Sequence, residues 1–428
     1  PRARLLFLLL IFFILSLAMG VFAYVVAKIF SEVKPEAVIP TWSLIAIAVL
    51  MGLSIYKAKA PLGPVTAIGV AAMLFTVWLG FKFPLRVASL QTWVYILLVY
   101  AYVASALPVW LLLQPRDYVN SFALYLSLLL LYLGLFVGAP RVVAPALNRY
   151  AQDLPPIFPL LFVVVACGAI SGFHSLVSSG TSAKQLASER DAPIIGYGGM
   201  LVEGALAVAA LLSCAAGFAT RSEWLSHYGS WGLAKGAPLK AFIGGAASVV
   251  SKLGIPKGFA ATLIAVIAVG FAMTTLDTAT RLLRYNVEEL AATLGIRPLR
   301  NRWLASAVAV AAIGFFALVK VGGKPAGMLL WPLFGSTNQL LAGLALLVGT
   351  VYLVLRRKSP AFTGLPMAFM LTATISAIFL NLRAFASQGA TSLVVVSVIV
   401  LLLAIWLVAE AALSLARRRA ASGEVEHR

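Results

Sequence analysis

The strongest constraint on this chain is a series of long apolar segments that repeats from one end of the sequence to the other. We count twelve of them, and short stretches that carry most of the charged residues separate them. An α-helix of about 20 apolar residues spans the hydrocarbon core of a bilayer, because it satisfies its own backbone hydrogen bonds there. The sequence therefore predicts an all-α, polytopic membrane bundle of about 12 helices. The segments lie near residues 5–30, 41–56, 64–83, 91–113, 118–138, 157–179, 193–217, 258–276, 303–320, 327–355, 363–382 and 391–416.

Composition supports this prediction and excludes two other classes of protein. Of the residues, 62% are hydrophobic and only 11% are charged, whereas about a quarter are charged in a soluble domain. A net charge of +19 would suit a nucleic-acid partner, but the basic residues stand in short clusters between apolar segments. We therefore predict contacts with anionic membrane lipid and no nucleic-acid partner.

The distribution of basic residues predicts which side of the membrane each loop occupies. When alternate loops are assigned to two sides, one side collects 19 of the 33 basic residues, including the dense cluster Arg356–Lys358. The positive-inside rule makes that side cytoplasmic. We predict one membrane domain over residues 1–416, a cytoplasmic basic tail over 417–428, and an external loop from Phe218 to Lys257 with a helix at the membrane interface.

Polar residues gather on one face of the segment that starts at Pro159 and ends at Asp191. At about 100° per residue, its polar side chains fall on one arc of roughly 120°. A polar helix face at membrane depth lines a water-filled cavity or coordinates a polar ligand. Close helix packing, with hydroxyls bonded back to their own helix, would explain the same residues. The arc contains Cys167, Ser171, His174, Ser175, Ser178, Thr181, Ser182 and Gln185, and Ser179 stands at its edge.

Ionisable residues within the apolar segments are few, so each is informative. Glu203 stands ten residues after Pro193, near mid-bilayer, and is our first candidate for coupling proton movement. A structural carboxylate bonded to a neighbouring helix is the alternative.

Asp277 has Thr274 and Thr278 beside it, and oxygen ligands of this kind suit Na⁺. An ion pair with Arg281 at i+4 explains the same spacing without an ion.

Two further segments carry helix breakers next to polar side chains. WPLFGSTNQLLAG, from Trp331 to Gly343, predicts a discontinuous helix that offers Asn338 and Gln339 to a substrate. LPVWLLLQPRDY, from Leu107 to Tyr118, places Arg116 in a predicted loop. There Arg116 would bind a substrate carboxylate, pair with Asp117 or face the cytosol.

The sequence shows no sign of an enzyme or of a bound cofactor. HExxH, GxSxG and P-loop motifs are absent, and the two cysteines lie inside apolar segments. A membrane hydrolase that uses Ser175 or Ser178 with His174 is a distant possibility. We predict no catalytic residues, no cofactor and no resident metal other than a coupling Na⁺, either at Ser178 and Thr181 or at Thr274, Asp277 and Thr278.

Five motifs in this order resemble the carbon starvation protein CstA family. They are ACGAISGFHSLVSSGTSAKQL from Ala166, IGYGGMLVE from Ile195, LPVWLLLQPRDY, LDTATR from Leu276 and WPLFGSTNQLLAG. The resemblance implies a secondary transporter for peptides or pyruvate, used under carbon starvation, in a bacterial or archaeal cytoplasmic membrane. It also implies the fold of the amino acid, polyamine and organocation superfamily, which has two inverted five-helix repeats.

Family members carry an upstream broken helix and paired histidines, and this chain begins at Pro1 without them. The resemblance therefore indicates that N-terminal helices are missing from this sequence. Our leading functional hypothesis is import of pyruvate or small peptides coupled to H⁺ or Na⁺, with Glu203 and His174 in coupling. The alternative is a membrane sensor or scaffold whose basic run from Arg281 to Arg302 recruits a partner. No oligomeric state is predicted.

Overall fold

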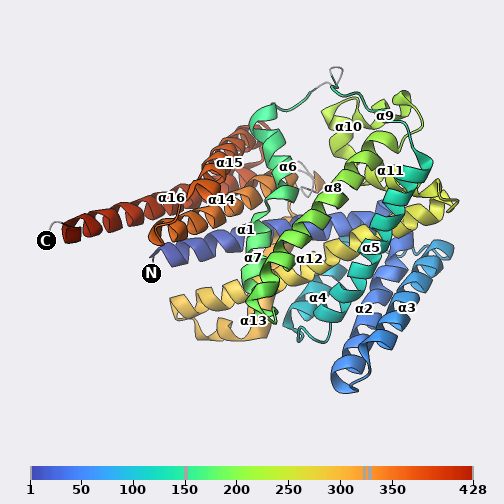
Figure 1. Ribbon diagram of the computed structural model, residues 1–428, viewed down its shortest axis with the longest axis horizontal. Coiled ribbons are helices and arrows are strands. Elements are labelled where there is room, and N and C mark those ends of the chain that lie inside the picture. The colour runs from blue at the N-terminus through green and yellow to red at the C-terminus, as the bar shows by residue number, and fades with distance from the viewer. Residues whose placement is uncertain (1, 149–152, 322–323, 326–329, 427–428) are drawn as a thin grey trace. The chain divides into compact units, whose positions relative to one another are not determined.

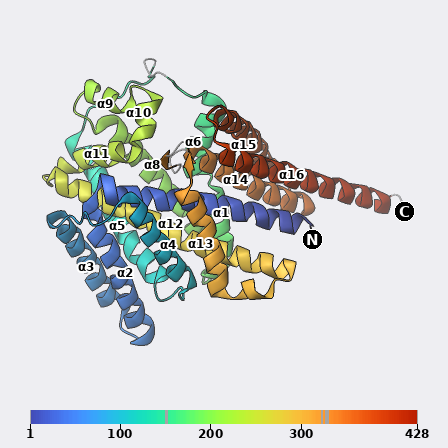
Figure 2. The ribbon, with the colours of Figure 1, turned by 180° about the vertical axis from the view of Figure 1, so that it is seen from behind.

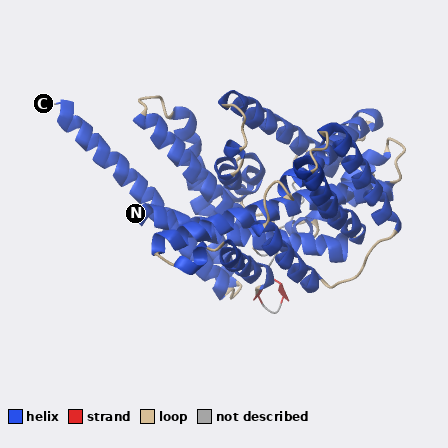
Figure 3. Ribbon diagram, turned by 90° about the horizontal axis from the view of Figure 1, so that it is seen from below, coloured by secondary structure: helices blue, strands red, loops and turns tan. Residues whose placement is uncertain are grey.

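The computed structural model describes residues 2–148, 153–321, 324–325 and 330–426. Helices make up nearly all of this part of the chain, and its strands form one two-residue hairpin, Lys320–Val321 with Lys324–Pro325 (Figure 3). The all-α prediction is confirmed. The chain forms two compact units, each assembled from several stretches of sequence. Residues 1–416 as one domain and 417–428 as a tail stay predictions.

The first unit consists of residues 1–21, 156–185 and 279–428. Within it, α14 and α15 lie side by side, and α16 lies along α15 (Figure 1). Asn381 on α15 ties this pair together, because its Nδ2 donates to Ser336 Oγ on α14 at 3.0 Å. The helices that contribute to this unit are α1 (Arg2–Lys28), α6 (Phe162–Ala169), α7 (Gly172–Gly180), α12 (Lys257–Leu294), α13 (Arg302–Leu318), α14 (Trp331–Leu355), α15 (Ala361–Ser387) and α16 (Thr391–Glu426).

The second unit consists of residues 22–155 and 186–278, so α1 and α12 contribute residues to both units. Its helices α2 and α3 form an antiparallel pair (Figure 2). Helix α11 packs between α5 and α8 around a core that includes Leu131, Ala246 and Val250. The other helices of this unit are α2 (Val38–Gly52), α3 (Leu62–Lys82), α4 (Leu90–Ala106), α5 (Leu113–Gly138), α8 (Gly199–Ala216), α9 (Arg221–Tyr228), α10 (Trp231–Gly236) and α11 (Pro238–Ser251).

Ten helical segments of the described chain are long and apolar enough to cross a membrane. They account for ten of the twelve predicted spans. The two remaining spans, predicted near 91–113 and 303–320, correspond to the shorter apolar helices α4 and α13. The polytopic helical bundle is therefore confirmed, and the inverted five-helix repeat stays a prediction.

Helix α12 is longer than the sequence analysis predicted. We expected a span over 258–276, whereas α12 continues to Leu294 as one helix of 38 residues. No glycine or proline stands between Asp277 and Leu294 to end it. The helix ends at Leu294, and the next residue, Gly295, has a φ of +77°. This is the left-handed conformation that glycine adopts at helix ends.

Candidate functional site

The polar segment predicted from Pro159 to Asp191 contains a real break in the membrane helix. Helix α6 ends at Ala169 and α7 begins at Gly172, so Ile170 and Ser171 lie between them. Asn338 on α14 fills this break. Its Oδ1 accepts from Phe173 N at 2.9 Å, and its Nδ2 donates to Ser171 Oγ at 3.0 Å. The predicted discontinuity near 157–179 is therefore confirmed, and one side chain from another helix satisfies it.

Gly172 allows α7 to approach α14 closely enough for these bonds. A Cβ atom at this position would meet the backbone oxygen of Asn338, the Leu341 side chain and the backbone of Ala342. Only glycine lacks that atom, so the contact between the start of α7 and α14 depends on it. The structure thus identifies α14 as the helix against which Gly172 packs.

The second predicted discontinuity is wrong, because α14 is a continuous helix from Trp331 to Leu355. Pro332 lies in its first turn, where a helix tolerates proline because those backbone N–H groups have no intrahelical acceptor. Asn338 and Gln339 therefore project from an intact helix. Asn338 is bound as described, whereas Gln339 is fully buried and neither its Oε1 nor its Nε2 has a hydrogen-bond partner in the described chain.

The hydroxyls of α7 bond back to their own helix. Ser175 Oγ donates to Gly172 O at 2.6 Å, and Ser178 and Ser179 donate to Ser175 O at 3.1 and 2.8 Å. This is what the packing interpretation predicts. A hydroxyl that donates in this way still has lone pairs to offer a cation, so the predicted Na⁺ site at Ser178 and Thr181 stays a prediction. Thr181 Oγ1 is buried and has no partner in the described residues.

His174 is exposed on α7. Among the described residues its side chain makes no hydrogen bond to Ser175 or Ser178, whose hydroxyls donate to backbone carbonyls. The nucleophile–base contact that a hydrolase would need is therefore not formed here.

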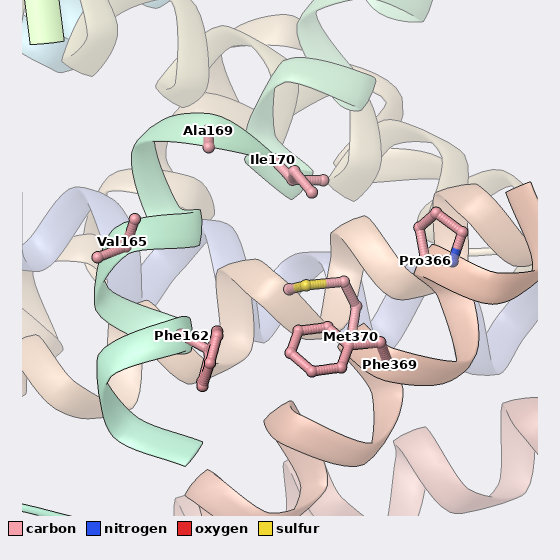
Figure 4. A pocket seen from close by; sticks show the side chains of 7 residues that line it. All are labelled: Phe162, Val165, Ala169, Ile170, Pro366, Phe369 and Met370. Atoms are coloured by element: carbon pink, nitrogen blue, oxygen red, sulfur yellow. The ribbon is translucent and has the colours of Figure 1, made fainter. Parts of the chain in front are cut away.

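An apolar pocket of about 210 Å³ lies beside the break, between α6 and α15 (Figure 4). Aliphatic, aromatic and thioether groups line it, so it offers no hydrogen bond to a charged substrate. Its lining residues are Phe162, Val165, Ala169, Ile170, Pro366, Phe369 and Met370.

The second unit contains a buried ion pair between Arg116 on α5 and Asp277 on α12, and both side chains are fully buried. Arg116 Nη1 donates to Asp277 Oδ2 and also to the Tyr100 hydroxyl at 2.5 Å. Tyr100 Oη in turn donates to Asp277 Oδ2 at 2.6 Å. These three residues form a connected polar cluster among apolar helices, where an uncompensated charge would be costly.

This cluster corrects the sequence analysis at Arg116. We expected a loop residue that pairs with Asp117 or faces the cytosol, whereas Arg116 lies in the first turns of α5 and its side chain has no exposed surface. The reason is that Pro115 lies in the first turn of α5, where a proline does not interrupt the helix. Asp117, the next residue, is exposed.

The other residues predicted to form the site are Thr274, Thr278 and Glu203, and each has its own surroundings. Thr274 Oγ1 donates to Phe271 O at 3.0 Å, and Thr278 is half-buried one residue after Asp277. Glu203 is exposed on α8 and makes no hydrogen bond or ion pair with the described residues, so the structural alternative, a bond to a neighbouring helix, is not formed. Glu203 in proton coupling and Na⁺ at Thr274, Asp277 and Thr278 stay predictions.

Sequence reasoning missed Tyr100, Asn120 and Trp42. Tyr100 stands in an ordinary aromatic-rich helix, and only the packing of α4 shows that it joins the ion pair. Asn120 is a polar side chain within a predicted span and is 2% exposed, so a search for amides as well as ionisable groups would have found it. Trp42 packs edge-on against the Tyr100 ring with centroids 5.5 Å apart, and no pattern in the sequence indicates that contact.

Comparison with known proteins now identifies the family. The family model described as carbon starvation protein CstA matches residues 1–226 and 224–377. The chain belongs to the CstA family. The resemblance stated from the five motifs is thus confirmed.

Curated members of the family are named as transporters. The chain is 31% identical to the peptide transporter CstA of Mycobacterium tuberculosis strain H37Rv, over 85% of this chain and 57% of that protein. It is 34% identical to the peptide transporter CstA of Escherichia coli K12, over 67% of this chain and 48% of that protein. It is 30% identical to the pyruvate/proton symporter BtsT of the same strain, over 87% of this chain and 63% of that protein.

The matched region spans about half to two thirds of the length of these curated relatives. No solved structure matches the chain.

Proposed function

We propose that this protein is a secondary active transporter that imports pyruvate or small peptides across the cytoplasmic membrane, coupled to H⁺ or Na⁺, as part of the response to carbon starvation. The observation that carries the proposal is the fully buried Arg116–Asp277 pair in a bundle of membrane-competent helices. Charged side chains inside a membrane protein are costly and mark substrate or ion pathways. The names of the relatives supply the substrate classes.

The first unit contributes a second set of polar groups to this proposal. Ser171 and Asn338 hold the break between α6 and α7, and broken helices expose backbone groups at transport sites. Gln339, the residue after Asn338 on α14, is buried, and its amide atoms have no hydrogen-bond partner in the described chain. We place the hydroxyls of α7 along the path, with His174 and Glu203 as the groups that move the coupling proton.

Uptake of labelled pyruvate and of a labelled dipeptide into proteoliposomes of the full-length protein tests the proposal. We expect accumulation that depends on an imposed H⁺ or Na⁺ gradient and collapses when the gradient is dissipated. Unchanged uptake by Glu203→Gln and His174→Ala would remove those two residues from the coupling role. No uptake of either substrate, together with partner capture that depends on Arg297 and Arg300, would favour the sensor or scaffold instead.

A further inference from the structure

Arg116 uses only one end of its guanidinium group within the protein. The side-chain hydrogen bonds of Arg116 to Asp277 and Tyr100 are both donated by Nη1. Nε and Nη2 are buried and have no hydrogen-bond partner in the described chain. On a planar guanidinium, Nε–H and one N–H of Nη2 point in the same direction and match the two oxygens of a carboxylate. The unused edge of Arg116 therefore has the geometry of a carboxylate site.

Two other buried side chains of the same unit carry donors without partners in the described chain. Asn120 follows Arg116 by four residues on α5, so the two share a helix face, and its Nδ2 has no partner in the described residues. Trp42 Nε1 is also buried without a partner there, on a ring that packs against Tyr100. All of these unused atoms are donors, so the set is complementary to an anion and would bind a cation poorly.

Charge balance decides what must accompany such an anion. The Arg116–Asp277 pair is neutral as it stands, and a bound carboxylate would leave one uncompensated negative charge among apolar helices. Protonation of Asp277 restores neutrality. The other groups that face Asp277 are Tyr100 from α4 and both Arg116 and Asp117 from α5. Arg281 follows Asp277 by four residues on α12.

We propose that the Nε–Nη2 edge of Arg116 binds the carboxylate of the transported substrate, and that Asp277 takes up one proton when that carboxylate arrives. The inference rests on the proposed transport function. It assigns the anion site of that function, and it makes Asp277 the carrier of the coupling proton in place of His174 and Glu203. The proton comes from the water on the side of entry, bonds to a carboxylate oxygen of Asp277 and is released to water on the other side with the substrate. Arg116 keeps its charge throughout, and Tyr100 continues to donate to the carboxyl group.

The binding half is tested by calorimetric titration of pyruvate into the purified full-length protein, with pyruvamide, which lacks the carboxylate, as the matched probe. We expect pyruvate to bind and pyruvamide not to bind. Arg116→Lys keeps a cation for Asp277 but loses the planar edge, so its affinity for pyruvate should fall about 10- to 100-fold. Arg284→Lys is the control, because Arg284 is a buried arginine of α12 that pairs with Glu288 instead, and its affinity should not change.

A second variant keeps the test decisive if Arg116→Lys does not fold. Asn120→Leu leaves the ion pair intact and removes an unpaired donor, so a purely structural Asn120 would leave pyruvate binding unchanged. We expect instead that the affinity falls about tenfold while the thermal unfolding temperature is kept or raised. Wild-type affinity in Asn120→Leu, or equal binding of pyruvate and pyruvamide, would overturn the carboxylate site.

The coupling half is tested by comparing two kinds of transport in Asp277→Asn proteoliposomes. Exchange of external labelled pyruvate for internal pyruvate should persist, because the neutral amide mimics the protonated carboxyl. Accumulation driven by a proton gradient should be lost. Proton-driven accumulation by Asp277→Asn would refute the assignment. If the wild-type protein binds pyruvate but transports neither pyruvate nor peptides, the proposed function fails while the carboxylate site stands.

Discussion

At the scale of single residues, Asn338 and Gln339 are neighbours on α14 with opposite hydrogen-bonding states. Asn338 bonds to Ser171 and Phe173 across the helix break, whereas the Gln339 amide is buried without a partner in the described chain. A satisfied buried amide stabilises the fold, and an unsatisfied one destabilises it. Asn338 therefore holds the helix break together, whereas the amide of Gln339 is available to a ligand.

Substitutions at these two positions should therefore have opposite effects on stability. Asn338→Ala should lower the free energy of unfolding by about 1–3 kcal/mol, because it leaves buried groups of α7 without their partner. Gln339→Leu should keep or raise stability and should reduce substrate uptake. Thermal unfolding in detergent and uptake in proteoliposomes measure the two effects. A strongly destabilised Gln339→Leu protein would show that the amide has a structural partner.

Gly172 and Gly168 provide a matched pair on the two sides of the break. Gly172→Ala would place a methyl group against Leu341 and the backbone of α14, and overpacking of this kind costs about 1–3 kcal/mol. Gly168 has nothing within 4 Å of an added Cβ, so Gly168→Ala should be neutral or stabilise α6 by up to about 1 kcal/mol. Unfolding temperatures of the two variants check this, and equal temperatures would contradict the close approach of α7 to α14.

At the scale of elements, α11 shows how glycine sets the distance between helices. Buried residues line one face of α11, which packs against both α5 and α8. Gly134 of α5 lies against the Val249 backbone, and Gly217, just after α8, lies against Gly245. Membrane helices associate through small residues because their backbones can then approach closely.

Gly245→Ala and Gly244→Ala should accordingly differ, although they are adjacent. A Cβ at Gly245 would collide with the backbone of Ser213, whereas one at Gly244 meets nothing within 4 Å. We expect Gly245→Ala to separate α11 from α8 and lower stability by about 1–3 kcal/mol. Gly244→Ala should have little effect on stability. Detergent unfolding measures both, and tolerance of Gly245→Ala would mean that α11 packs elsewhere.

At the scale of the whole molecule, the basic clusters determine a topology that can be tested directly. The loop at Arg356–Lys358 should be cytoplasmic and the loop that contains α9 should be external, because positively charged loops are retained inside. This assignment follows from the sequence and does not depend on how the two units are arranged. It also tells which end of the bundle faces the cytoplasm, and the direction of transport is defined relative to that end.

Cysteine labelling in intact cells tests this topology. The chain has two free cysteines, Cys167 and Cys214, which are half-buried, and Cys167→Ser with Cys214→Ala removes them. In that background, Ser222→Cys, at an exposed position of α9, should react with an impermeant maleimide. Ser359→Cys, at a position that is also exposed, should react only after the membrane is permeabilised. The reverse pattern would invert the topology.

The sequence by itself determined that the chain is an all-α membrane bundle, where most of its helices lie and which family it belongs to. These properties depend on local apolar length and on motifs that are read along the chain. Only the tertiary structure decided that Asn338 closes a break 167 positions away and that Arg116 pairs with Asp277 across 161 positions. It also decided that Pro115 and Pro332 lie in the first turns of helices, where they do not break them. The physical reason is that a buried polar group takes its partner from whichever helix packs against it, and the spacing of residues along one helix does not specify that neighbour.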